Sequence, residues 1–234
     1  MDMSERISKK TFHCFFEQSG TFKNEFRKLG YEAFDYDISN DFNKTDFVID
    51  LFKEIENAYN NKKSIFDNLE KDDEIIAFFP CVRFTEQILL WFRGDHAQAK
   101  NYTQKQKLEK NLEHHKELHY LYNLITKLVI VCIDKKIPLV IENPHGTQHY
   151  LTTHWSLKPK IIDKDRTIRG DYFVKPTQYF FVNREPSQNF IFEAYAVNRR
   201  KVIAKINGFT KEGKVERSMI APEYANRFIR EFII

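Results

Sequence analysis

Short apolar segments alternate with longer amphipathic segments over residues 1–144 of the chain. The apolar segments are rich in aromatic and β-branched residues and are bounded by turns or charges, which is the pattern of buried strands. The amphipathic segments repeat their apolar residues every three or four positions, as helices do. This alternation predicts an α/β fold with a Rossmann-like, doubly wound and mostly parallel sheet. The predicted strands are residues 11–16, 31–36, 46–50, 74–79 and 138–141, and the predicted helices are residues 21–29, 51–59, 86–92 and 101–135.

The longest predicted helix, residues 101–135, has one apolar stripe that runs from Leu108 and Leu112 to Cys132. A helix with such a stripe packs it against a core. We therefore expect the stripe to be buried along its whole length, and Cys132 to be a structural residue.

Residues 145–234 are more polar and more basic than the segment before them. Their pattern predicts strands at 178–182 and 190–196 and a helix at 223–234. Pro222, just before this helix, is suited to a first helical turn. We expect them to form a small basic C-terminal elaboration of a single domain that spans residues 1–234.

Composition and charge narrow the class of protein. Of the 234 residues 42% are hydrophobic and 30% charged, which is enough to bury a core. Three cysteines lie far apart, no apolar run is long enough to span a membrane, and the first residues lack an apolar signal segment. These features predict a cytoplasmic protein.

Residues 1–80 have a charge balance of −6 and residues 81–234 one of +10. This asymmetry fits a nucleic-acid enzyme with a separate cofactor half, or a surface with uneven charge.

Four predicted strands end in residues suited to chemistry. Gly20 follows the first strand, Asp37 the second, Cys81 the strand that stops at Pro80, and Glu142 the strand at 138–141. Ligands bind outside the carboxyl ends of parallel strands, where a glycine turn admits a cofactor and an acid accepts hydrogen bonds from ribose. Cys81 is then either a nucleophile or a structural cysteine, and the acids are either site residues or solvated strand ends.

Several motifs occur in a specific order. The segments FEQSG (16–20), FPCVRFT (79–85) and ENP (142–144) resemble, in turn, the cofactor motif, the Pro-Cys nucleophile motif and the Glu-Asn motif of the DNA cytosine-5 methyltransferases. The segments KPT (175–177) and RSMIAPE (217–223) resemble signatures of the short phage and prophage members of that family.

The resemblance implies a class I methyltransferase-like fold that methylates carbon 5 of cytosine with S-adenosylmethionine. The partner would be double-stranded DNA with the target base flipped out, in a bacterial or phage-infected cell. Residues 145–217 would be a small DNA-contacting insertion, with the basic part at 156–217 facing phosphates. The implied catalytic residues are Cys81, Glu142 and Arg169. The implied cofactor ligands are Phe16, Gln18, Ser19, Gly20, Asp37, Asp50, Phe79 and Pro80, and the implied substrate or DNA ligands are Arg83, Asn143, Arg166, Lys175 and Thr177.

In this scheme Cys81 attacks carbon 6 of the ring, Glu142 holds or protonates the ring nitrogen, and Arg169 orients the base or lowers the pKa of the thiol. Asp37 takes the place of the ribose-binding acid, and Asp50 that of the acid beside the adenine amino group.

The chain departs from the family pattern at three points. Gln18 replaces a glycine of the cofactor motif, and Phe79 replaces the first proline of the nucleophile motif. A Gln-x-Arg-x-Arg motif is missing, and Arg166 and Arg169 are its nearest counterparts. Two alternatives therefore stay open: an inactive methyltransferase-like module that binds nucleic acid or a partner, and a different pyrimidine-modifying enzyme with the same thiol. Eight histidines are present, but their spacing predicts no metal site.

Overall fold

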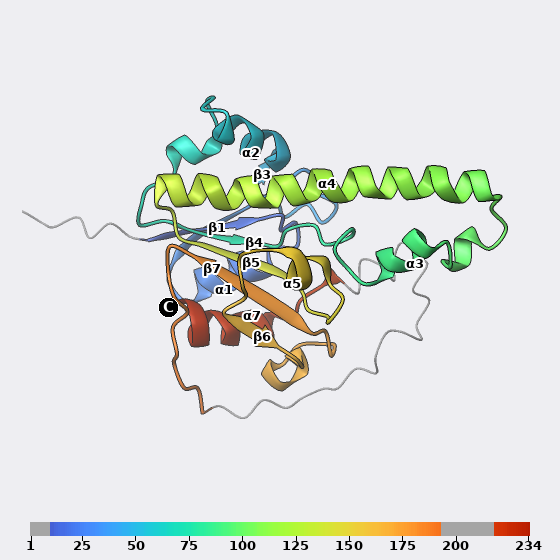
Figure 1. The fold of residues 1–234 in the computed structure, drawn as a ribbon. Helices are drawn as coiled ribbons and strands as arrows, with labels where there is room; N and C mark the ends of the chain where they lie inside the picture. Colours follow the sequence, from blue (N-terminus) through green and yellow to red (C-terminus); the bar gives the residue numbers. More distant parts are fainter. Residues whose placement is uncertain (1–9, 193–217) are drawn as a thin grey trace, which may run out of the picture.

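A computed structural model describes residues 10–192 and 218–234. They form a seven-stranded sheet flanked by helices, with the strand order β3-β2-β1-β4-β5-β7-β6 (Figure 1). The strands are β1 (Thr11–Phe15), β2 (Glu32–Asp37), β3 (Phe47–Val48), β4 (Glu74–Ala77), β5 (Leu139–Pro144), β6 (Ile161–Asp163) and β7 (Thr177–Val182). The helices are α1 (Thr21–Lys28), α2 (Leu51–Tyr59), α3 (Gln87–Arg93), α4 (Gln104–Lys135), α5 (Tyr150–His154) and α7 (Pro222–Phe228). Shorter helical turns are η1 (Ile65–Asn68), η2 (Ala97–Ala99), η3 (Arg166–Arg169) and η5 (Ile229–Ile233).

The first five strands are parallel, and β7 runs antiparallel to both of its neighbours, β5 and β6. The predicted α/β fold is therefore confirmed, and its mixed, mostly parallel sheet is compatible with the predicted Rossmann-like arrangement. The strand order changes direction at β1: the chain first adds β2 and β3 on one side and then β4 and β5 on the other. Such a point in an open α/β sheet leaves a crevice outside the carboxyl ends of the two central strands.

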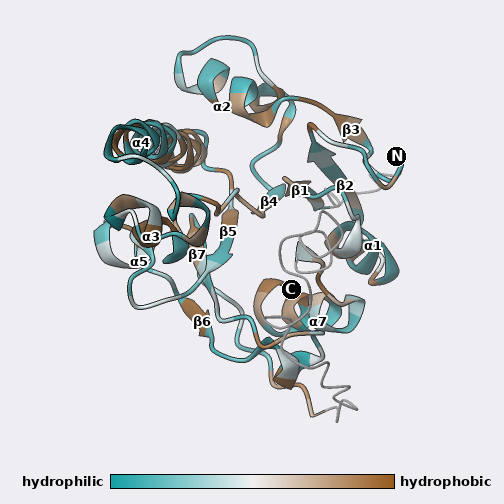
Figure 2. Cartoon of the chain, turned by 90° about the vertical axis from the view of Figure 1, so that its right-hand side faces the viewer, coloured by the Kyte–Doolittle hydropathy of each residue, from teal (hydrophilic) through white to brown (hydrophobic). Residues whose placement is uncertain are grey.

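Helices cover both faces of the sheet (Figures 1 and 2). Successive residues of a strand point to opposite faces, so each strand contributes to two cores. In β4, Ile75 packs in the core under α2 and α4, while Ile76 packs in the core under α1 and α7. Burial on both faces explains why these strands read as continuous apolar runs in the sequence.

Helix α4 has 32 residues and is about 48 Å long, so it extends well beyond the sheet (Figure 1). It begins three residues later than predicted, because Thr103 and Gln106 form a capping box at its start. Cys132 is buried, as predicted. The apolar stripe is not buried along its whole length: Leu108 and Leu112 are exposed, because that part of α4 lies past the edge of the sheet.

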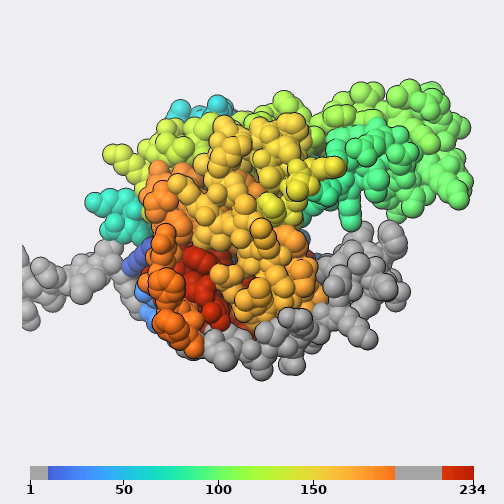
Figure 3. Space-filling view, turned by 60° about the horizontal axis from the view of Figure 1, so that its bottom comes forward, coloured from blue at the N-terminus to red at the C-terminus, as the bar shows by residue number. Residues whose placement is uncertain are grey.

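The C-terminal segment packs into the body of the domain. Pro222 occupies the first turn of α7, as predicted, and the backbone of Phe232 and Glu231 accepts hydrogen bonds from Ser187 and Asn189. Figure 3 shows this segment (red) lying between earlier parts of the chain, drawn in orange on one side and in yellow on the other.

The region predicted as an insertion, residues 145–217, is in part an integral piece of the sheet. Strands β6 and β7 fall within it and complete one edge of the sheet. The predicted strand at 190–196 is not formed at 190–192, and its remainder, residues 193–196, lies outside the described residues, as does the rest of 193–217. No helix in the described ranges is long and apolar enough to cross a membrane.

Candidate functional site

A cavity of about 220 Å³ opens at the carboxyl edge of the sheet, at the crevice between β1 and β4. Six separate parts of the chain line it: the loop after β1, the end of β2 with the loop that follows, the loop after β4, the end of β5, the loop before β7, and the segment before α7. Its walls are formed by Phe16, Glu17, Gln18, Ser19, Asp37, Phe42, Phe78, Phe79, Pro80, Cys81, Glu142, Lys175, Ser218, Met219 and Ile220. Nine of the residues singled out from the sequence are therefore brought together here, although up to 159 positions separate them in the chain.

The loop after β1 has an unusual backbone at both of its ends. Phe16 has a φ of 60°, a left-handed conformation that is costly for a bulky residue, and its amide donates to the carbonyl of Tyr36. Gly20 has a φ of 69°, which glycine adopts without that cost, and it leads directly into α1. Gly20 does not itself line the cavity, so its part in the site is to shape the turn.

Glu17 is a residue of this loop that the sequence reasoning did not single out. Its two carboxylate oxygens accept hydrogen bonds from the amides of Phe22 (2.8 Å) and Lys23 (3.2 Å) at the start of α1. Burial raises the pKa of Glu17 to about 7, although these two hydrogen bonds oppose the shift. A carboxylate of the protein itself thus occupies the anion-binding position at the amino terminus of α1.

Gln18 and Ser19 form the outer part of the loop. The side-chain oxygen of Gln18 accepts a hydrogen bond from the amide of Asp41, so the side chain is tied to the loop after β2. The Ser19 hydroxyl lies within hydrogen-bonding distance of the Thr21 hydroxyl at 3.1 Å. Both predicted cofactor residues therefore line the cavity with their positions fixed by neighbours.

A second cavity, of about 400 Å³, adjoins the first and shares Phe16, Asp37, Phe78 and Pro80 with it. Its remaining walls are largely apolar, with one acid: Ile38, Asp50, Leu51, Phe52, Val82 and Leu121.

The two acids predicted as cofactor ligands both border this second cavity. Asp37 stands at the boundary between the two cavities, and burial raises its pKa, while the amide of Ser39 donates to it at 2.7 Å. Asp50 also caps α2, because one of its oxygens accepts from the amides of Phe52 and Lys53.

Cys81 lies just past Pro80 and is half-buried on the wall of the first cavity. Burial raises the pKa of its thiol; the positive charge of Lys175 opposes the shift, and the negative charge of Glu142 adds to it. Cys14 and Cys132 are completely buried in the two cores. Cys81 is thus the cysteine that a ligand in the cavity can reach.

Phe79 and Asn143 fix the position of the segment that carries Cys81. Phe79 is buried among Phe16, Phe52 and Phe84. The side-chain amide of Asn143 donates to the carbonyl of Phe79 at 3.0 Å and so ties the end of β5 to the end of β4. Asn143 does not line the cavity, and its contact is with the protein backbone.

Glu142 is buried at the end of β5, and its Oε1 atom has no hydrogen-bond partner among the described residues. The nearest cation is Arg166, whose Nη1 atom lies 3.8 Å from Glu142 Oε1. Arg166 is itself fully buried: it pairs with Asp171, lies over the ring of Tyr224, and donates weakly to Thr177 at 3.5 Å. An unsatisfied buried carboxylate oxygen facing a cavity is a group that a ligand can satisfy.

Two arginines predicted to act in the site lie elsewhere. Arg169 pairs with Asp163 and Glu231 on the side of the C-terminal segment. Arg83 turns toward α4 and pairs with Glu117. The structure therefore does not bring Arg169 together with Cys81, and the position beside Glu142 belongs to Arg166.

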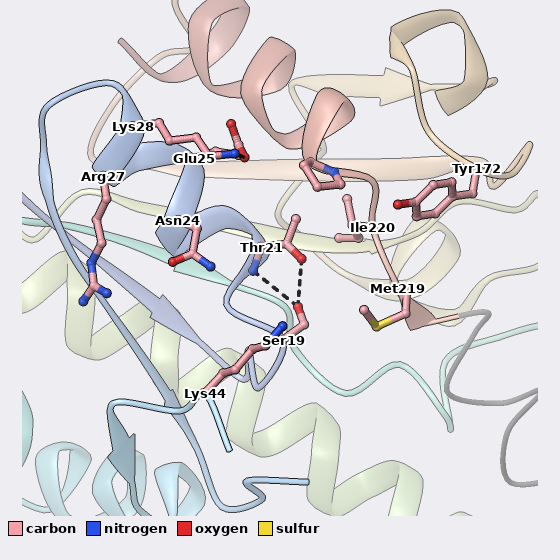
Figure 4. A pocket seen from close by; sticks show the side chains of 11 residues that line it. Ser19, Thr21, Asn24, Glu25, Arg27, Lys28, Lys44, Tyr172, Met219 and Ile220 are labelled. Atoms are coloured by element: carbon pink, nitrogen blue, oxygen red, sulfur yellow. Dashed lines mark hydrogen bonds and ion pairs between the residues drawn. The ribbon is translucent and has the colours of Figure 1, made fainter. Parts of the chain in front are cut away.

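A third cavity, of about 630 Å³, lies beside the first and shares Ser19, Met219 and Ile220 with it. Side chains of α1 line one side, and Tyr172, Met219 and Ile220 line the other (Figure 4). Sequence reasoning assigned no role to Met219 or Ile220, although they belong to the RSMIAPE segment that resembles a family signature.

No group of three or more histidine, cysteine, aspartate or glutamate side chains in residues 10–192 and 218–234 is arranged to hold a metal ion.

A scan against protein-family models and a search of curated proteins gave no match to this sequence.

Proposed function

We propose that this protein is an S-adenosylmethionine-dependent enzyme that methylates carbon 5 of cytosine in DNA through the thiolate of Cys81. The observation that carries the proposal is that Cys81 and Glu142 line one cavity together with Phe16, Asp37 and Pro80. The motif resemblance gives these residues the roles of nucleophile, acid and cofactor ligands. Their meeting at the point where the strand order reverses supports those roles, because ligands bind there in open α/β sheets.

The shapes of the two adjoining cavities suit an adenosyl cofactor. The second cavity has apolar walls for a purine ring, with Asp50 at its border, and Asp37 stands at the boundary where a ribose would lie. The first cavity offers a polar space that leads from Asp37 to Cys81. When bound there, S-adenosylmethionine would supply an electrophilic methyl group.

Glu17 favours this cofactor over a dinucleotide. Dinucleotide sites place a pyrophosphate on the amides at the start of the first helix. Here the Glu17 carboxylate accepts the hydrogen bonds of those amides, so a pyrophosphate would have to displace it. Glu17, Asp37 and Glu142 also make the cavity wall acidic, which suits the cationic sulfonium and ammonium groups of S-adenosylmethionine.

The residues of the chain have clear parts in such a reaction. The sulfur of Cys81 forms a bond to carbon 6 of cytosine, and the electron pair of the carbon 5–carbon 6 double bond becomes available at carbon 5. Glu142, in its protonated form, donates a hydrogen bond or a proton to the ring nitrogen and so favours this attack. Carbon 5 would take the methyl group with S-adenosylhomocysteine as the leaving group. Carbon 5 then loses its proton to a base, the electron pair of that bond re-forms the carbon 5–carbon 6 double bond, and the carbon–sulfur bond breaks to release Cys81 as a thiolate.

One observation favours the second candidate, a methyltransferase-like module without this activity. Gln18 stands where the family pattern has a glycine, and its side chain lines the cavity with its oxygen held by Asp41. Such a side chain takes up room beside the amino-acid part of the cofactor. The two candidates differ in whether the chain binds the cofactor at all.

The test is calorimetric titration of the full chain with S-adenosylhomocysteine, followed by transfer of a radioactive methyl group from S-adenosylmethionine to DNA. We expect binding, with the affinity reduced about tenfold or more in Asp37→Asn because a charged hydrogen bond is lost. Asp72→Asn, which changes an exposed acid away from the cavity, is the matched control. No binding at saturating cofactor would refute the methyltransferase proposal and leave the inactive module.

A further inference from the structure

The reversed strand β7 brings the loop before it to the cavity. Thr177, the first residue of β7, pairs with Pro144 at the end of β5. Because β7 is antiparallel to β5, its beginning lies at the carboxyl edge of the parallel strands. The loop is fixed by two hydrogen bonds, from the Thr177 hydroxyl to the Lys175 carbonyl at 2.9 Å and from the His145 amide to the Pro176 carbonyl at 2.8 Å. This places Lys175 on the cavity wall with Cys81 and Glu142.

Lys175 is the only basic residue on the described wall of this cavity, which otherwise carries the carboxylates of Glu17, Asp37 and Glu142. The nearby arginines are engaged elsewhere: Arg83 with Glu117, Arg166 with Asp171, and Arg169 with Asp163 and Glu231. The ammonium group of Lys175 has no ion-pair partner within residues 10–192 and 218–234. No ion pair with these residues therefore neutralises its positive charge, which can act electrostatically on the Cys81 thiol.

A cysteine acts as a nucleophile when its thiol is ionised, and most of the surroundings of Cys81 disfavour the thiolate. Burial and the Glu142 carboxylate both raise the pKa of the thiol; the positive charge of Lys175 is the larger of the two influences that lower it, the other being a backbone hydrogen bond. A cation beside a cysteine commonly makes it reactive, because the thiolate is the nucleophile.

We propose that Lys175 is a positioning residue for the Cys81 nucleophile: its ammonium group stabilises the thiolate inside an otherwise acidic cavity. The inference deepens the proposed function and rests on it for the nucleophilic role of Cys81. It replaces the role that the sequence gave to Arg169, which lies away from the thiol.

The test is the rate at which iodoacetamide alkylates Cys81 in the folded full chain as a function of pH, followed by mass spectrometry of the Cys81 peptide. We expect the pH midpoint to rise by about one unit in Lys175→Met, and the rate below that midpoint to fall about tenfold. Lys175→Arg keeps the charge and should retain the profile of the unaltered protein. Lys164→Met, which removes an exposed lysine elsewhere, is the matched control.

The buried Cys14 and Cys132 serve as internal reporters of folding, because they should stay unmodified in every variant. If Lys175→Met exposes them, Lys175→Gln provides a polar replacement of similar length for the same measurement. A profile in the Met or Gln variant that coincides with that of the unaltered protein would overturn the proposal.

The two proposals can fail separately. A shifted alkylation profile in a chain that does not bind S-adenosylhomocysteine supports the role of Lys175 and refutes the methyltransferase. An unshifted profile in a chain that transfers methyl groups refutes the role of Lys175 and leaves the methyltransferase intact.

Discussion

Arg166 is the buried cation beside the carboxylates of Asp171 and Glu142, so its replacement by methionine tests how much this ion pairing stabilises the protein. The guanidinium is fully buried, lies 2.5 Å from Asp171 Oδ2 and 3.8 Å from Glu142 Oε1, and is stacked over Tyr224. Methionine keeps the length and apolar character of the side chain but removes the charge. Asp171 and Glu142 would then face a buried environment without a compensating cation.

The expected loss in the free energy of unfolding depends on the interactions that Asp171 keeps after Arg166 is replaced. Removal of one partner of a buried ion pair costs about 3–5 kcal/mol. Asp171 retains hydrogen bonds from the amides of Tyr172 and Ala221, so we expect a loss near the lower limit, about 3 kcal/mol. For a chain of this size that corresponds to a fall in melting temperature of roughly 6–12 °C.

Urea unfolding monitored by circular dichroism measures this loss, with Arg93→Met as the control, since Arg93 is exposed and should change the free energy of unfolding by less than about 0.5 kcal/mol. The double variant Arg166→Met/Asp171→Asn should recover part of the loss, because it also removes the stranded charge. If Arg166→Met lost less than about 1 kcal/mol, the ion-pair reasoning would be refuted.

Four further substitutions, in three experiments, test other parts of the structure. Glu17→Gln removes a group whose pKa of about 7 in the folded protein lies above its ordinary value of 4.5. The unaltered protein should therefore lose up to about 3 kcal/mol of stability relative to Glu17→Gln as the pH rises from 4.5 to 7, and urea titrations that show no such pH dependence would contradict the burial argument. Asn143→Ala should cost about 1–3 kcal/mol and disturb Cys81, because the carbonyl of Phe79 loses its hydrogen bond; unchanged stability and unchanged alkylation of Cys81 would count against this tie. In α4, Leu124→Ala should cost about 2–5 kcal/mol and Leu112→Glu less than about 0.5 kcal/mol, since only the former is buried; equal losses would contradict the extension of α4 beyond the sheet.

The sequence predicted the sheet well because its strands are buried on both faces. The apolar runs at β1, β4 and β5 and the helical spacing between them determine the alternation, and the alternation determines a mostly parallel sheet. The reversal of β7 and the addition of β6 did not follow from local pattern. β6 is three residues long, and pairing direction depends on neighbours far away in the chain.

In the site, too, local pattern predicted some features, while others depend on parts of the chain that are distant in sequence. Residues directly after predicted strands, such as Cys81 and Glu142, were placed correctly at one edge of the sheet, because the carboxyl ends of parallel strands share that edge. The directions of the side chains could not be predicted from the sequence. Nothing in the positions of Arg166 and Arg169 along the chain indicates which of them is buried beside Glu142. Glu17 was missed although the start of α1 was predicted, because the bend of the loop between Phe16 and Gly20, which turns the Glu17 carboxylate onto the first amides of α1, does not follow from the sequence.

The most direct test of the proposed chemistry is whether Cys81 forms a covalent bond to the target base. The full chain would be incubated with S-adenosylmethionine and a DNA duplex in which 5-fluorocytosine replaces cytosine, a base that cannot lose a proton from carbon 5. We expect a denaturant-stable protein–DNA complex that maps to the Cys81 peptide and is absent from Cys81→Ser. A chain that binds the cofactor and the duplex but forms no such bond would contradict the role of Cys81 as nucleophile.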